Sequence, residues 1–240
     1  MRHSCATAVL CLTLSTCAAP AASLQVSPVN LDVPAPGRAS MLTVRNMGES
    51  PISAQVRVFR WTQHAGVERL EPTRDVVASP PFVELRARQD YSLRVIRLPG
   101  RPVAAEEAYR IVIDELPKPQ TGSGTVALVL RHVVPLFFSG RDSSPASPVF
   151  AIARRGNDAI LQVTNRGESR VRLSAITVRD GSGRSVPLTQ GLLGYALAQS
   201  SMQWRIAGAA RRLAPGTRIS ISGVADRGLF NATSIVTAAD

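Results

Sequence analysis

The sequence has 240 residues and a formal net charge of +11 at pH 7, with 45% hydrophobic and only 5% aromatic side chains. Lys118 is the only lysine, and the arginines occur as scattered singles and pairs, which indicates a solvated basic surface rather than a nucleic-acid site. All three cysteines fall within the first 17 residues, which excludes a disulfide framework in the rest of the chain.

The chain begins with the three parts of a secretory signal peptide. Arg2 precedes the apolar run ATAVLCLTLSTC, and AAPAAS then offers small residues for cleavage. We therefore predict a signal peptide over 1–22, with a lipoprotein signal ending at Cys17 as the alternative. No later run is long and apolar enough to cross a bilayer, so we expect a soluble mature protein.

Strand patterns dominate the remaining sequence. Short segments rich in Val, Ile and Leu alternate with clusters of Gly, Pro, Asn and Ser, and no long stretch has the apolar period of a helix. These features predict an all-β protein built from antiparallel sandwiches. We assign 23–140 to a first domain, 141–147 to a polar linker and 148–240 to a second domain.

One nine-residue motif occurs in both predicted domains. The segment LTVRNMGES (42–50) returns as LQVTNRGES (161–169), in each case between two predicted strands. Asn and Gly in this order suit a turn that needs positive φ. The repeat predicts two similar sandwich domains.

The residues that catalysis or metal binding would need are sparse. Beyond the signal peptide the histidines are His64 and His132, and the chain has no Gly-x-Ser-x-Gly elbow or glycine-rich phosphate loop. We therefore expect neither an enzyme nor a metal, cofactor or nucleotide site.

The segment YRIVIDELP (109–117) contains a charge on an apolar face. Tyr109 begins one face of this predicted strand, whereas Arg110 shares the other face with Val112 and Asp114. A buried guanidinium needs a partner. Either Arg110 pairs within the protein, with Asp114 or with the acids at 106–107, or it binds a carboxylate that arrives with a ligand.

The segment GTVALVLRHVVPLFF (124–138) does not alternate. Between Val126 and Phe138 only Arg131 and His132 are polar, so apolar side chains occupy both faces of this predicted strand. Either the strand is central or covered by the second domain, or its second face is open to another chain. Exposed edge strands usually carry charges that prevent pairing, and this strand carries few.

These segments together resemble the periplasmic chaperones of chaperone–usher pilus assembly. The resemblance covers most of the chain after the signal peptide and rests on SLQVSPVNLDVPAPG, LTVRNMGES, VRVFRWTQ, RLEPTRDVVASPPFVEL, YRIVIDELP and TVALVLRHVVPLFF. It is greatest for the archaic branch, which serves spore-coat-U-like pilins. The second domain is similar only more loosely.

The resemblance implies a fold, a location and partners. It implies two immunoglobulin-like sandwich domains in an angled, boomerang arrangement, located in the periplasm. The chaperone completes a pilus subunit by donor-strand complementation and delivers it to the outer-membrane usher. No nucleic acid or small-molecule substrate is expected, and self-association of the free chaperone stays open. The alternative is a two-domain secreted adhesin or structural pilus component.

The resemblance also implies which face of the long strand binds the subunit. Counting by twos in the family's register, we expect the subunit groove to receive Val126, Leu128, Leu130 and His132. We expect the chaperone's own core to receive Ala127, Val129 and Val133. A slip of one residue would exchange these two faces.

A basic anchor for the subunit's terminal carboxylate is the second implied site. The best-known relatives use an Arg in the first strand and a Lys in the last, but this sequence has Asn30 and Pro135 near those positions. We therefore expect the anchor at Arg110, with Arg94 and Arg131 as the next candidates.

Overall fold

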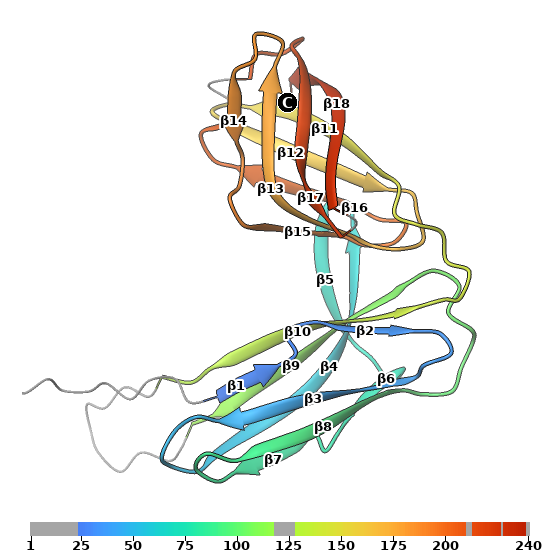
Figure 1. The fold of residues 1–240 in the computed structure, drawn as a ribbon, viewed down its shortest axis with the longest axis vertical. Coiled ribbons are helices and arrows are strands. Elements are labelled where there is room, and N and C mark those ends of the chain that lie inside the picture. Colours follow the sequence, from blue (N-terminus) through green and yellow to red (C-terminus); the bar gives the residue numbers. More distant parts are fainter. Residues whose placement is uncertain (1–23, 118–127, 210–212, 227, 239–240) are drawn as a thin grey trace, which may run out of the picture.

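The computed structural model describes residues 24–117, 128–209, 213–226 and 228–238 and shows two β domains that lie at an angle (Figure 1). The predicted signal peptide over 1–22, Val126 and Ala127 fall outside these ranges. Within them, no helix has the length and hydropathy needed to cross a membrane.

The first domain is formed by the strands in the first half of the chain. They are β1 (Leu24–Ser27), β2 (Leu31–Pro34), β3 (Ala39–Asn46), β4 (Ile52–His64), β5 (Val67–Pro72), β6 (Val76–Ser79), β7 (Phe82–Leu85), β8 (Asp90–Arg97), β9 (Glu107–Leu116) and β10 (Arg131–Ser139).

Two sheets make the sandwich of the first domain. One sheet has the order β1-β3-β8-β6, and the other has the order β2-β10-β9-β4-β5 with β7 also paired to β4. Alternate residues such as Leu42 and Val44 on β3 or Ile111 and Ile113 on β9 are buried between the sheets. This alternation is the pattern that the sequence predicted for half-buried strands.

The second domain follows after a short connection. Its strands are β11 (Pro148–Arg155), β12 (Asp158–Asn165), β13 (Val171–Asp180), β14 (Ser185–Pro187), β15 (Leu192–Ala196), β16 (Ser201–Ile206), β17 (Arg218–Ala225) and β18 (Gly228–Ala238).

Among the described residues, a single eight-stranded sheet folds around the core of the second domain. The order is β14-β13-β17-β18-β11-β12-β16, with β15 paired to β13, and β11 and β18 form a parallel pair between the two halves. Inward residues such as Leu161 and Val163 on β12 and Ile219 and Ile221 on β17 share one core. The prediction of an all-β protein with two immunoglobulin-like sandwiches is confirmed.

The repeated motif forms the same turn in both domains. Asn46 ends β3 and Asn165 ends β12, and both side chains are buried. Each Oδ1 accepts a hydrogen bond from the backbone N–H two residues later. Each Nδ2 donates to three backbone oxygens at 2.8–3.2 Å, those of Ser50, Leu85 and Arg86 for Asn46 and those of Ser169, Ala196 and Leu197 for Asn165.

The expectation that this turn needs positive φ is wrong. Neither Gly48 nor Gly167 has a left-handed backbone, because the asparagine side chain, rather than a left-handed residue, closes the turn. Gly167 is required for another reason. A Cβ at this position would lie 1.9 Å from the backbone oxygen of Pro145, so the connection between the domains passes directly over the glycine.

The connection between β10 and β11 is tied to the Asn165 turn. The N–H of Ser144 donates to Oε2 of Glu168 at 2.8 Å, and Oγ of Ser169 donates to the oxygen of Ser144 at 2.9 Å. The N–H of Ser147 donates to Oδ1 of Asn165 at 2.9 Å. The second copy of the motif therefore holds the chain where it passes from one domain to the other.

We expect Asn165→Ala to lower the free energy of unfolding by more than about 2 kcal/mol, because buried carbonyls that lose their donor cost about 1–3 kcal/mol each. Urea denaturation measures the change. Asn231→Ala, at an exposed position of β18, is the matched control and should change stability by less than about 0.5 kcal/mol. Equal urea midpoints for the two variants would contradict the role given to Asn165.

Candidate functional site

Strand β10 has an open edge. It pairs antiparallel with β9 from Arg131 to Phe138, whereas on its other side β2 pairs only with the residues from Leu136 to Ser139. In the described part of the chain no strand pairs with the second edge between Arg131 and Pro135. The backbone groups at that edge are available to a strand from another chain.

The two faces of β10 are exchanged relative to the prediction. Val134 and Phe138 are buried in the core of the first domain and Leu130 packs against it, while Nε2 of His132 lies 2.9 Å from the oxygen of Leu24. The prediction that Leu130 and His132 face a subunit is therefore wrong for the free protein.

Residues assigned to the core lie on the outside instead. Val129 and Val133 are 42% and 45% exposed, so their assignment to the core is also wrong. The register is fixed by the large side chains at the end of β10, and counting back from Phe138 by twos puts the even positions inside. Leu128 lies before the first residue of β10 and is 76% exposed, but it is an even position like Leu130, so its role in binding stays a prediction.

The register places three side chains of β9 beside those of β10 on the outward face. Arg110 lies opposite Pro135, Val112 opposite Val133, and Asp114 opposite Arg131. Arg110, Val112 and Asp114 therefore form a row along β9. Its side chains change from a cation at the domain junction, through an apolar residue, to an acid at the outer end.

The acid at the outer end of the row is occupied. Asp114 accepts hydrogen bonds from Arg131 and, at 2.6 Å, from Nη2 of Arg57. Burial raises the pKa of Asp114, but the hydrogen bonds and charges of the two arginines outweigh it and leave that pKa below its ordinary value. Asp114 is consequently not the partner of Arg110.

Arg110 points toward the junction of the domains. Its Cζ lies 3.6 Å from the centroid of the Trp61 ring and 5.8 Å from that of Tyr195, which belongs to the second domain. The other acids that the sequence offered are also occupied, because Glu106 pairs with Arg170 and Glu107 pairs with Arg97.

No hydrogen bond or ion pair among the described residues engages the guanidinium of Arg110. Burial lowers its pKa, and the negative charge of Glu68 acts in the opposite direction. Arg94 is far from this face, because it lies exposed on β8 in the opposite sheet of the first domain. Arg131, on β10, is paired with Asp114 through its Nε, so of the three arginines Arg110 is the one near β10 whose guanidinium has no ion pair among the described residues.

An aromatic cluster joins the two domains beside Arg110. The ring of Trp61 lies 5.9 Å from that of Phe137 and 5.5 Å from that of Tyr195, and the last two rings are 5.8 Å apart. Gln63 adds two hydrogen bonds, from its Nε2 to the oxygen of Tyr195 at 2.7 Å and from the N–H of Leu197 to its Oε1 at 2.9 Å. Strand β4 therefore reaches from the first core into the second domain (Figure 1).

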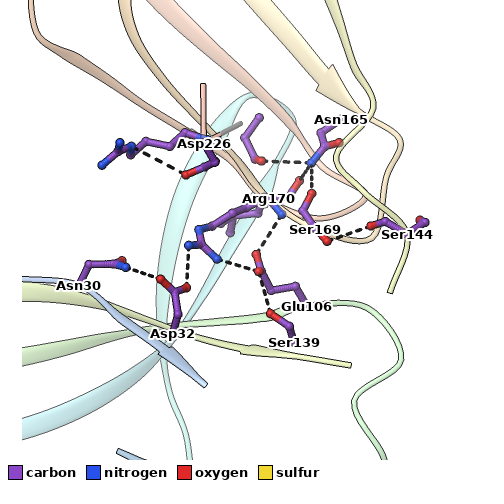
Figure 2. Close-up of polar contacts among 12 residues, drawn as sticks. Asn30, Asp32, Glu106, Ser139, Ser144, Asn165, Ser169, Arg170 and Asp226 are labelled. Carbon is purple, nitrogen blue, oxygen red and sulfur yellow. Dashed lines mark hydrogen bonds and ion pairs between the residues drawn. The ribbon is translucent and has the colours of Figure 1, made fainter. Parts of the chain in front are cut away.

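Figure 2 shows the ionic contacts at the same junction. Nη1 of Arg170 donates to Oε2 of Glu106 at 2.7 Å and Nη2 donates to Oδ1 of Asp32 at 2.6 Å. The guanidinium also lies over Phe137, with Cζ 3.6 Å from the ring centroid. Burial raises the pKa of Glu106, and the charge and hydrogen bonds of Arg170 oppose that shift.

Sequence reasoning missed the residues of this junction. Trp61 and Gln63 lie two positions apart on one face of a predicted strand, which is a local signal for a shared role. Their partner Tyr195 lies in the other domain, and no local pattern connects it with β4. Arg170 directly follows the repeated motif, but nothing in the motif indicates that it pairs with Glu106 and Asp32 of the first domain.

The first domain matches a known family. Residues 23–141 match the model of the pili and flagellar-assembly chaperones, PapD N-terminal domain. A comparison with curated protein sequences gives no match.

The fold is similar to that of solved chaperones over both domains. A chain from the CsuC–CsuE chaperone–tip adhesion subunit pre-assembly complex of the archaic Csu pili of Acinetobacter baumannii has 21% identity, a TM-score of 0.68, and covers 91% of this chain and 100% of its own. A chain from the complex of the Salmonella enterica SafA pilin with the SafB chaperone has 21% identity and a TM-score of 0.62, with coverages of 90% and 98%. The CupB2 chaperone of Pseudomonas aeruginosa has 17% identity and a TM-score of 0.54, with coverages of 87% and 98%.

The corrected faces of β10 give opposite expectations for two neighbouring valines. Val134→Asp should unfold the first domain, because it buries an unpaired carboxylate at a cost of more than about 3 kcal/mol. Val133→Asp should leave the domain folded, since its side chain lies outside. Thermal unfolding followed by circular dichroism tests both variants, and a folded Val134→Asp would show that the faces are assigned wrongly.

Proposed function

As a member of the pili and flagellar-assembly chaperone family, the protein is a chaperone of pilus assembly, and we propose that it binds subunits by lending them β10. An incomplete subunit sandwich accepts the open edge as its missing strand, and backbone hydrogen bonds supply affinity without dependence on sequence. The observation that carries the proposal is the unpaired edge from Arg131 to Pro135.

The outward side chains of β10 supply the apolar contacts. In the corrected register Val129 and Val133 enter the groove of the subunit. Burying such side chains stabilises a complex by roughly 1.5–3 kcal/mol each. Exposed apolar residues on an unpaired edge promote aggregation. Their presence is explained if a bound subunit covers them.

Arg110 is the proposed anchor for the subunit's terminal carboxylate. A guanidinium presents paired N–H donors that match a carboxylate in a two-pronged arrangement. Arg110 lies on β9 opposite Pro135, so its guanidinium reaches the outward face near the domain junction, one strand away from a chain that follows the open edge of β10.

The protein acts by binding alone, in the periplasm, and delivers its subunit to the outer-membrane usher. No catalysis, cofactor or nucleotide takes part in this proposal, and release follows when the segment of another subunit replaces β10. The solved complexes of CsuC with CsuE and of SafB with SafA support this assignment of partners. The alternative of an adhesin or structural pilus component is not favoured, because residues 23–141 match the chaperones.

We expect Val133→Asp to abolish recovery of a soluble one-to-one complex with a co-expressed pilus subunit, because it places a charge in the apolar groove. Val149→Asp is the matched control, since Val149 is a 48% exposed strand valine in the second domain. This control should leave recovery unchanged. If both substitutions lower recovery equally, or neither does, β10 is not the binding strand.

We expect Arg110→Ala to weaken capture of the subunit by at least about tenfold, because a carboxylate at the junction loses its charged partner. The melting temperature of the free chaperone should change little, since no ion pair of the described residues is lost. Arg94→Ala, on the opposite sheet, is the control. Destabilisation of the empty protein with unchanged capture per folded molecule would make Arg110 a structural residue.

A further inference from the structure

We propose that Trp61 and Tyr195 are positioning residues for Arg110, so that the carboxylate anchor is held by a platform that the two domains share. The proposal rests on the function given above and specifies how the anchor is built. In this proposal the domain junction not only connects the two domains but also forms part of the binding site.

The stacking geometry leaves the donors of Arg110 free. With Cζ 3.6 Å from the centroid of Trp61, one face of the guanidinium is in contact with the indole ring. The N–H bonds of the guanidinium lie in its plane and point outward from Cζ. Stacking on the indole ring can therefore hold the guanidinium in place without using any of its hydrogen-bond donors. The residues opposite Arg110 on the neighbouring strands, Phe59 and Pro135, offer no polar side chain.

Three other arginines of the described chain also lie over aromatic rings, and each has a partner for its donors. Arg57 bonds Asp114, Arg60 bonds the hydroxyl of Tyr109, and Arg170 bonds Glu106 and Asp32. Arg110 shares their stacking but, among the described residues, none of their hydrogen bonds. The contact with Trp61 therefore holds Arg110 in place while its hydrogen-bond donors remain available to a group from another molecule.

Trp61 is fixed by the second domain. The indole is 1% exposed and meets the Tyr195 ring edge to face. The backbone around Tyr195 is fastened to β4 by the two hydrogen bonds of Gln63. Nε1 of Trp61 is buried without a hydrogen-bond partner in the described part of the chain, so a second unused donor belongs to the platform.

The negative charge of Glu68 raises the pKa of Arg110, against the larger effect of burial. Glu68 lies on β5 opposite Gln63, whose Nε2 is 3.5 Å from its Oε1. An incoming carboxylate is repelled by Glu68 while it is attracted by Arg110. Removing that negative charge should therefore strengthen the capture of a carboxylate, whereas a purely structural Arg110 would give no such gain.

The experiment compares two forms of one pilus subunit, with a free terminal carboxylate or with a terminal amide introduced by protein ligation. Capture is measured per folded chaperone molecule. Trp61→Leu should weaken capture of the carboxylate form by about tenfold, and Trp61→Phe should restore most of it, because a ring of smaller area still stacks on Arg110. Capture of the amide form should be the same for the wild type and both variants.

Two further pairs of variants keep the test decisive where Trp61→Leu does not fold. Tyr195→Leu should reproduce the selective loss and Tyr195→Phe should not, because the ring rather than the hydroxyl contacts Trp61. Glu68→Gln should raise capture of the carboxylate form about twofold, and Glu71→Gln, on an exposed part of the same strand, should have no effect.

The outcomes separate the platform from the proposed function. Equal losses for the carboxylate and amide forms in Trp61→Leu or Tyr195→Leu would overturn the platform, because the rings would then support the fold only. Selective loss in Arg110→Ala without loss in the ring variants would also overturn it, while the anchor would stand. Failure of the wild type to capture either form would refute the proposed function itself.

Discussion

The partly buried ion pair between Arg170 and Glu106 is the contact that fixes how the two domains meet. Arg170 comes from the second domain, and its partners Glu106 and Asp32 come from the first. Removing one partner of the pair leaves an uncompensated charge in a place that water reaches only in part, which is unfavourable. Since the same guanidinium also covers Phe137, the aromatic cluster and the ionic contacts hold the junction together.

Strand β10 connects this junction with the open edge. Its last residues are held on both sides, by β9 and by β2, and Phe137 lies in the aromatic cluster between the domains. Among the described strands, only β9 pairs with its first residues. The strand is therefore rigid at the junction and available at the other end, where an added strand finds both backbone groups and apolar side chains.

The sequence predicted the fold well because alternation and turn residues are local. It predicted the second face of 126–138 as a place for another chain, but it assigned the faces wrongly. The family's register was extended from Val126, whereas the large residues at Leu136 and Phe138 decide which side is inside. The acids near Arg110 in the sequence, at 106–107 and 114, form ion pairs with arginines of other strands. Which arginine pairs with which acid depends on tertiary contacts, which the sequence pattern does not show.

The two copies of the asparagine turn have the same local structure but different roles. The copy that ends β3 stabilises its own sandwich, because every hydrogen bond of the Asn46 side chain among the described residues stays within the first domain. The residues around Asn46 are therefore restrained by one requirement. The copy that ends β12 closes an identical turn and also carries the connection through Gly167, Glu168 and Ser169. In related proteins, sequence variation should therefore be wider in the first copy than in the second, although both copies end a strand with the same asparagine hydrogen bonds.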